Sequence, residues 1–115
     1  MLPVDHRFEK WNNFPQARER LLKTLPSNSI LISGDRHIGE VSQVEVDENT
    51  LTEVTSSGLT HAYSKLKKEE NRYRKGSFVN KNNFGLILIN WDDKKATLQI
   101  KGQENQALEE VVVHF

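Results

Sequence analysis

The sequence predicts a single α+β domain across residues 1–115, in which one N-terminal helix, one buried strand and then antiparallel strands form a layered α/β sandwich. Three observations favour this class: an apolar stripe with helical spacing, an unbroken apolar run shortly after it, and strand-like segments separated by polar turns from residue 83 onward. A chain of 115 residues buries roughly 65% of the surface that its unfolded form exposes, so one hydrophobic core is feasible.

The predicted helix covers residues 15–25. Proline suits the first turn of a helix, because its missing N–H would be unpaired there in any case, and Pro15 occupies that place. The apolar positions that follow have helical spacing, and they are Ala17, Leu21, Leu22 and Leu25. Charged residues fill most of the other positions, and Pro26 ends the segment, so an amphipathic helix is expected.

Residues 29–33 form a short apolar run without alternation, which is typical of a strand buried on both faces in the middle of a layered sheet. Residues 39–46 and 51–55 predict two further strands around a turn at 47–49. If these two strands form a hairpin, the chain returns with residues 56–61 at the rim where residues 35–37 lie.

The rest of the chain, from residue 65 onward, divides into a charged segment and a β-rich end. Residues 65–75 are dense in Lys, Arg and Glu, which indicates a solvated loop or short surface helix, with a phosphate-binding patch as the alternative. Residues 84–91, 96–101 and 107–115 predict three strands with polar turns between them, and the middle one alternates cleanly, as a half-exposed strand does.

The overall composition excludes several classes of function. Sixteen basic residues balance sixteen acidic ones, so no strong field of one sign favours nucleic acid as a partner. The absence of cysteine excludes disulfides, zinc–thiolate sites and thiol nucleophiles. No apolar run approaches the ~20 residues of a membrane span, and the first residues show no export signal.

One short segment carries the strongest chemical signal. Asp35 and His37 follow a predicted buried strand and Gly34, and residues two apart in an extended chain point to the same side. Carboxylates bind hard cations, whereas imidazoles bind iron, zinc or manganese, so the pair suits a mixed metal site. The alternative is a capped turn, with Asp35 bonded to nearby N–H groups and His37 on the surface.

Several segments together resemble one known family, the PhoD-like metallophosphatases (alkaline phosphatase D). Residues 33–37, Ser-Gly-Asp-Arg-His, resemble the Gly-Asp-x-His motif near the end of the family's catalytic domain. Residues 11–22 are similar to its Trp-Asp-Gly-Tyr-Pro-x-x-Arg-x-x-Leu-Leu segment, and residues 55–61 resemble the Thr-Ser-Ser segment that follows the motif. Residues 83–85 begin the next similar strand, so the resemblance covers most of residues 8–91.

The resemblance implies half of a metallophosphoesterase fold and the hydrolysis of phosphate esters with metal ions, either Ca, Fe, Mn or Zn. Asp35 would then be a metal ligand, and His37 would bind metal or orient the bound phosphate. Arg36 could hold phosphate through a bidentate contact. His61 and Tyr63, on the rim described above, would contact the phosphate-ester substrate.

The departures from the family pattern limit what this chain is expected to do alone. The family's other metal ligands lie in earlier acidic and Asn motifs that have no counterpart here, and Asn12 and Asn13 replace its usual Asp-Gly. We therefore expect a C-terminal portion of a catalytic domain, inactive by itself, from a family whose members are typically exported. The alternative is a non-catalytic α+β interaction module with a relic metal motif.

Partners follow from the same picture. A strand at residues 29–33 without one or both neighbours would leave unpaired N–H and C=O groups on an apolar edge. Self-association or pairing with a missing N-terminal half is therefore expected.

Overall fold

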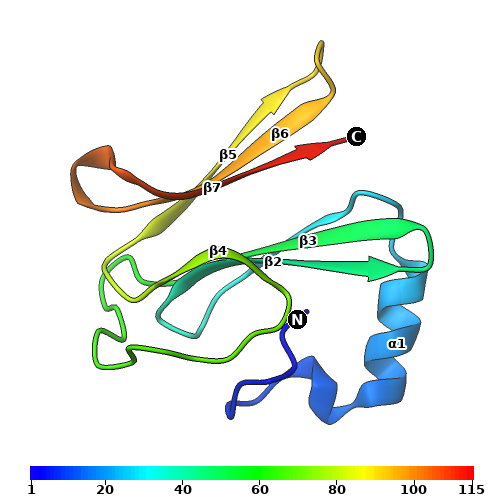
Figure 1. The fold of residues 1–115 in the computed structure, drawn as a ribbon, viewed down its shortest axis with the longest axis horizontal. Helices are drawn as coiled ribbons and strands as arrows, with labels where there is room; N and C mark the ends of the chain where they lie inside the picture. Colours follow the sequence, from blue (N-terminus) through cyan, green and yellow to red (C-terminus); the bar gives the residue numbers. More distant parts are fainter.

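The computed structural model describes residues 1–115 and contains two β-sheets that pack face to face, with one α-helix outside them (Figure 1). The four-stranded sheet has the order β1-β3-β2-β4 and is built from β1 (Ile30–Ser33), β2 (Gly39–Val46), β3 (Asn49–Ser56) and β4 (Arg74–Val79). Strands β2 and β3 form the predicted hairpin, and only the β1–β3 pair is parallel.

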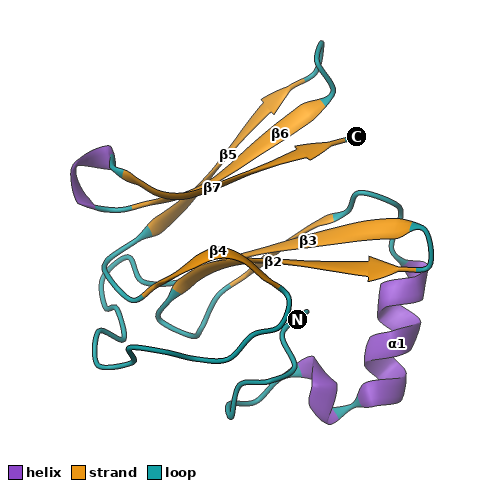
Figure 2. Ribbon diagram, viewed as in Figure 1, coloured by secondary structure: helices purple, strands orange, loops and turns teal.

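The three-stranded sheet has the order β5-β6-β7 and is antiparallel throughout. It comprises β5 (Phe84–Asn90), β6 (Lys95–Lys101) and β7 (Ala107–His114), and a short 3-10 helix, η2 (Gln103–Asn105), lies between β6 and β7. Figure 2 shows this sheet diverging from the four-stranded sheet towards the β5–β6 turn. The clean alternation predicted for residues 96–101 is confirmed, because Ala96, Leu98 and Ile100 are buried and the residues between them are half-buried.

The main core fills the space between the two sheets. Its buried members come from both sheets, and they are Val41, Val54, Val79, Ala96, Leu98, Ile100 and Val113. A second, smaller cluster lies on the opposite face of the four-stranded sheet. There α1 (Pro15–Thr24) and the N-terminal segment supply Leu22 and Leu2, which pack with Leu31 and Leu51. The amphipathic helix predicted for residues 15–25 is thus confirmed.

The predicted α+β class is wrong, because 42% of the residues are in strands and 14% in helices, with one α-helix in the whole chain. The structure is a β-rich fold of one mixed and one antiparallel sheet, and it is not a layered α/β sandwich. The physical reason lies in the apolar run at residues 30–33. A short run of this kind shows that a segment is apolar, but it does not show how many layers cover it.

The prediction of a central, doubly buried strand at residues 29–33 is also wrong. Strand β1 lies at the edge of its sheet and pairs only with β3. Leu31 faces the cluster under α1 and is buried, whereas Ile32 faces the other side and is 75% exposed, since the three-stranded sheet does not extend over it. An apolar edge therefore remains uncovered.

Strand β4 was not predicted: only Arg74 and Lys75 of it lie in the charged segment 65–75, which suggests a solvated loop or short surface helix, and no strand was predicted at residues 76–79. It is an edge strand, and of its two charged residues Arg74 is bound to the buried Glu40, whereas Lys75 is exposed. Gly76 has a φ of 71°, a conformation that favours glycine, and the β2–β4 register shifts between Gly39 and Val41. An irregular, charged edge strand has neither of the periodicities on which the prediction depended.

Buried charges line the face of the four-stranded sheet that the N-terminal segment covers. Glu40 is fully buried and accepts hydrogen bonds from Arg36 Nη1 at 2.6 Å and Arg74 Nε at 3.0 Å. Glu53 is fully buried as well and binds the Met1 amino group at 2.6 Å and the Leu2 N–H at 2.5 Å. These pairs attach the N-terminal segment and the segment after β1 to the sheet. Removing one partner of a buried ion pair strongly destabilises the fold, because the other charge is then left buried and unpaired.

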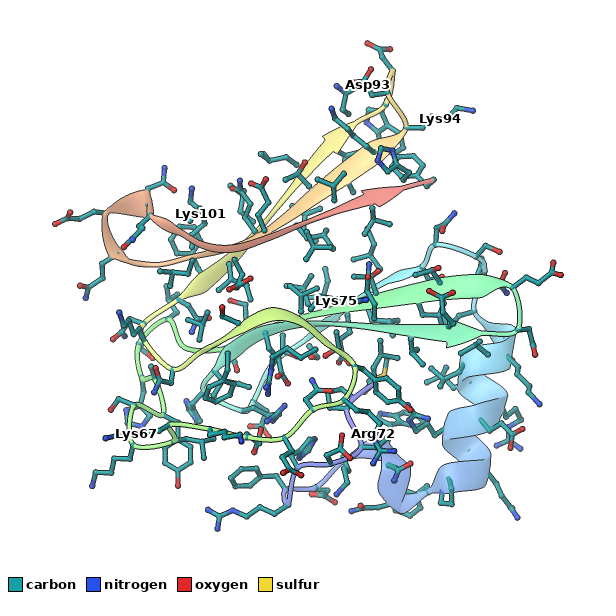
Figure 3. All side chains as sticks on the ribbon, in the orientation of Figure 1. Lys67, Arg72, Lys75, Asp93, Lys94 and Lys101 are labelled. Atoms are coloured by element: carbon teal, nitrogen blue, oxygen red, sulfur yellow. The ribbon has the colours of Figure 1, made fainter.

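A further surface pair connects the N-terminal segment with the loop before β4. Arg72 binds the Asp5 carboxylate through Nη2 at 2.6 Å, and Figure 3 shows Arg72 beside the N-terminal segment. The hydrogen bond from the Arg72 side chain holds the pKa of Asp5 below its ordinary value.

The structure contains no helix with the length and hydrophobicity that a membrane span requires.

Candidate functional site

The five residues that the sequence singles out lie around one open cavity of about 400 Å³. They are Asp35, Arg36, His37, His61 and Tyr63, and the N-terminal segment adds Phe8 and Glu9 to the wall. The β2–β3 hairpin brings them together as expected, because the end of β3 returns the chain to the segment that follows β1. We refer to this space as the Asp35/His37 cavity.

The prediction that Asp35 and His37 point to the same side required an extended backbone after β1. The backbone between β1 and β2 is not extended. Asp35 has a φ of 70° and His37 a φ of 54°, so both residues adopt the left-handed conformation. Non-glycine residues held in this region store strain of order 1–3 kcal/mol, and such residues cluster at functional sites. The two side chains still border the same cavity, but they do so through this tight double turn rather than through strand alternation.

The two histidines of the cavity are held against each other. His37 Nδ1 lies 3.0 Å from the backbone oxygen of His61, and the two ring centroids are 5.1 Å apart in an edge-to-face arrangement. A carbonyl oxygen can only accept, so Nδ1 carries the proton and Nε2 keeps a free lone pair. This is the arrangement by which proteins prepare a histidine to bind a metal ion or to accept a proton.

Tyr63 lies in the same loop as His61 and also contacts His37. Its backbone N–H donates to the His37 carbonyl at 2.8 Å, and its ring contacts Phe8 edge-on with a centroid distance of 6.5 Å. His37 is therefore bonded through both its side chain and its backbone to the segment that carries His61 and Tyr63.

Arg36 borders the cavity, but its guanidinium is already engaged. It forms ion pairs with Glu40 at 2.6 Å and with Glu69. Nη1 is bound to Glu40, and Nη2 and Nε are buried, so the guanidinium has no exposed edge for a bidentate phosphate contact. The structure therefore gives Arg36 a role in holding the segment after β1, which differs from the phosphate contact expected from the resemblance.

Three asparagines that the sequence argument overlooked position the loop that carries His61. Asn80 Nδ2 donates to the Leu66 carbonyl at 2.9 Å, and Asn82 Nδ2 donates to the Leu59 carbonyl at 3.2 Å. Asn83 is buried, and its Oδ1 accepts a hydrogen bond from the Ser56 hydroxyl at 2.9 Å. A signal was present in the sequence, because the run Asn-Lys-Asn-Asn at 80–83 is rich in side chains that bond to nearby backbone.

The donor types around the cavity suit a metal ion, although their number is small. Glu9 and Asp35 are carboxylates, and His37 and His61 are imidazoles, which together match the ligands of iron, manganese or zinc. However, no three of the acidic or histidine side chains in the structure are grouped closely enough to hold an ion. Glu9 has no sequence signal that separates it from other surface acids, so pattern reasoning missed it.

The electrostatics of the cavity favour a cation. The charge of Arg36 is cancelled by Glu40 and Glu69, whereas Glu9 and Asp35 are exposed and form no ion pair. A free phosphate would meet two negative charges and no available positive one. A phosphate group would therefore bind here only with a cation between it and the carboxylates.

A buried histidine near the cavity makes the stability of the chain depend on pH. Burial, followed by the charges of Arg36 and Lys10, lowers the pKa of His6 from 6.5 to about 4, and the side chain is 5% exposed. Well above pH 6.5 the imidazole is neutral in both the folded and the unfolded chain. Below that value the unfolded chain takes up a proton that the folded chain does not, so stability falls with falling pH.

We expect the free energy of unfolding to decrease by up to roughly 3 kcal/mol between pH 6.5 and pH 4 through His6 alone. Urea unfolding at a series of pH values measures this change. The His6→Leu variant is the control, because it keeps an apolar group of similar size and should show a shallower dependence. Equal pH dependences in both proteins would show that another group is responsible.

Comparison of the chain with protein-family models, with curated proteins and with solved structures finds no match. The functional assignment therefore depends on the residues and on the geometry described above.

Proposed function

We propose that this chain forms one wall of the active site of a metal-dependent phosphate-ester hydrolase, with Asp35 and His37 as metal-binding residues. The single observation that carries the proposal is the Asp35/His37 cavity, where all five residues expected from the resemblance to PhoD-like metallophosphatases meet. The fixed position of His37 supports it, because both its ring and its backbone carbonyl are hydrogen-bonded to the segment that carries His61 and Tyr63.

The side chains of the cavity have separable roles in this proposal. Asp35 and the Nε2 atom of His37 would hold a metal ion, which supplies charge neutralisation and an acidified water molecule when it is bound. His61 lies beside His37 and would donate a hydrogen bond to a phosphate oxygen. Tyr63 keeps His37 in place through its backbone N–H and presents its ring to the cavity.

Two protein ligands provide only weak metal binding, and phosphoryl transfer needs several positive charges around the phosphate. Because this chain groups no three suitable ligands, the remaining ligands of a complete centre would come from outside it. We therefore propose that the chain binds metal weakly and has no appreciable phosphatase activity by itself.

We expect isothermal titration with Mn²⁺ or Zn²⁺ to detect one weak site, and Asp35→Ala and His37→Ala each to weaken it roughly tenfold or more. Asp92→Ala and His114→Ala are matched controls, because both residues are exposed and lie outside the cavity, and they should leave the affinity unchanged. Assays with 4-nitrophenyl phosphate and added Ca²⁺, Fe³⁺ or Mn²⁺ should show no turnover.

Two results would contradict these expectations. Equal affinities in the site variants and the controls would remove the proposed metal site. Turnover that Asp35→Ala abolishes would support the site but would overturn the prediction that the chain is inactive alone.

A second candidate function is a non-catalytic interaction module that retains a relic of the metal motif. It is favoured by the uncovered edge of the two sheets, where β1 and β5 each lack a neighbour on one side and Ile32 is 75% exposed. Strand β5 also carries no charge, so nothing in it discourages pairing with another strand. No metal binding, together with a mass that increases with concentration in sedimentation, would favour this candidate over the first.

A further inference from the structure

A second and larger cavity lies next to the Asp35/His37 cavity and shares His61 with it. Its volume is about 590 Å³, and it is formed by residues 60–62 and Ser64 of the His61 loop, residues 80–82 before β5, and the turn around η2. It lies on the side of the molecule where Figure 3 labels Lys67 and Lys101. Because His61 belongs to both walls, one bound molecule could reach into both cavities.

The lining of this second cavity is rich in carboxamides, so we refer to it as the carboxamide cavity. Four such side chains surround it, and they are Asn80, Asn82, Gln103 and Gln106. Lys81 contributes one positive charge, and no carboxylate or large aromatic side chain is present. Only Ala62 and Leu108 are apolar.

Much of the hydrogen-bonding capacity of the cavity is unused within the chain. The Nδ2 atoms of Asn80 and Asn82 donate to loop carbonyls, which leaves their Oδ1 atoms as acceptors. The side chains of Gln103 and Gln106 make no hydrogen bond to the protein, and Lys81 forms no ion pair. Each free carboxamide offers donors and an acceptor side by side.

Hydroxyl groups match this pattern best, because each hydroxyl both donates and accepts and neighbouring hydroxyls pair well with a carboxamide. A nucleobase would normally stack on a Phe, Tyr or Trp ring, and no such ring lines the cavity. An acyl chain would need an apolar wall, which two small apolar side chains do not provide.

We propose that the carboxamide cavity binds the polyol or sugar portion of a phosphate ester whose phosphate lies in the Asp35/His37 cavity. This inference rests on the proposed function, and it adds the class of substrate to it. His61 then marks the boundary between the phosphate and the hydroxyl-rich leaving group. Lys81 adds a positive charge on the side away from Asp35.

The test compares three probes in the presence of Mn²⁺: glucitol 6-phosphate, methyl phosphate and adenosine 5′-monophosphate. We expect glucitol 6-phosphate to bind roughly tenfold more tightly than methyl phosphate, because its hydroxyls can form two or more additional hydrogen bonds. In the double variant Gln103→Ala/Gln106→Ala this ratio should fall to near one, while the affinity for methyl phosphate is unchanged.

The double variant removes only exposed side chains, so its melting temperature should match that of the parent chain. Gln16→Ala, an exposed glutamine on α1, is the matched control and should keep the full ratio. A ratio near one in the parent chain, or a ratio that the double variant leaves intact, would overturn the inference. Tighter binding of adenosine 5′-monophosphate than of glucitol 6-phosphate would also overturn it.

A separate titration distinguishes this inference from the proposed function. Free glucitol at millimolar concentrations should shift the side-chain amide NMR signals of Gln103 and Gln106 without any phosphate or metal. If methyl phosphate does not bind but these signals shift, the phosphate site fails and the carboxamide cavity remains a polyol site. If neither is observed, both proposals fail.

Discussion

Replacing Glu40 with glutamine is expected to cost roughly 3–5 kcal/mol in the free energy of unfolding, because it leaves two buried guanidinium groups without their shared counter-charge. Glu40 is fully buried on β2, and it binds Arg36 at 2.6 Å and Arg74 at 2.9 Å. Glutamine has nearly the same shape but no charge. Since small domains are stable by only about 5–15 kcal/mol, this single change should bring the chain close to unfolding.

Glu45→Gln is the matched control for this experiment, since Glu45 lies on the same strand but is exposed and accepts only from Thr50. Its effect should stay within about 0.5 kcal/mol. Urea unfolding followed by circular dichroism measures both variants. A loss of less than about 1 kcal/mol for Glu40→Gln would show that Arg36 and Arg74 find other partners or reach solvent.

The same experiment connects stability to the candidate site. Arg36 lies between Asp35 and His37 in the chain, and its pairs with Glu40 and Glu69 hold the segment in which those two residues adopt left-handed backbone. Metal affinity in Glu40→Gln should therefore fall together with stability, even though Glu40 does not border the Asp35/His37 cavity.

The second large effect is expected for Leu98→Ala, at roughly 2–5 kcal/mol. Leu98 is fully buried on β6, the middle strand of the three-stranded sheet, and it packs with Val41 and Val54 of the other sheet. Alanine would remove three carbon atoms from the centre of the inter-sheet core, and neighbours on β5 and β7 cannot collapse fully into the space.

Thr97→Ala is its control, because Thr97 is the adjacent residue on the same strand but faces away from the core and is half-buried. A change below about 1 kcal/mol is expected there. Thermal or urea unfolding measures both variants. Similar losses for the two substitutions would contradict the packing of the three-stranded sheet against the four-stranded one.

Several features of the fold were predictable from local pattern. The helix between Pro15 and Thr24, the β2–β3 hairpin and the alternation of β6 each depend on residues close together in the sequence. Proline at a helix start, turn residues between strands and a period of two are local consequences of backbone geometry. For this reason the return of His61 towards His37 could also be anticipated.

Other features were not visible in the pattern. Strand β1 lies at the edge of its sheet because no segment pairs with it on one side. Its apolar sequence would suit a central strand equally well, so the sequence does not reveal this position. The left-handed backbone at Asp35 and His37, and the bond from the His37 ring to a carbonyl 24 residues later, follow from no local rule. The fold class was wrong for the same reason.

The sequence by itself determined which residue types stand next to Gly34 and which strands form hairpins, because these depend on neighbours along the chain. Only the tertiary structure decided that Arg36 turns to Glu40 and Glu69, that Glu9 joins the Asp35/His37 cavity, and that the carboxamide cavity exists. The physical reason is that buried charges and cavities are set by partners distant in sequence. The packing of the whole chain determines which buried charges pair and which residues line each cavity.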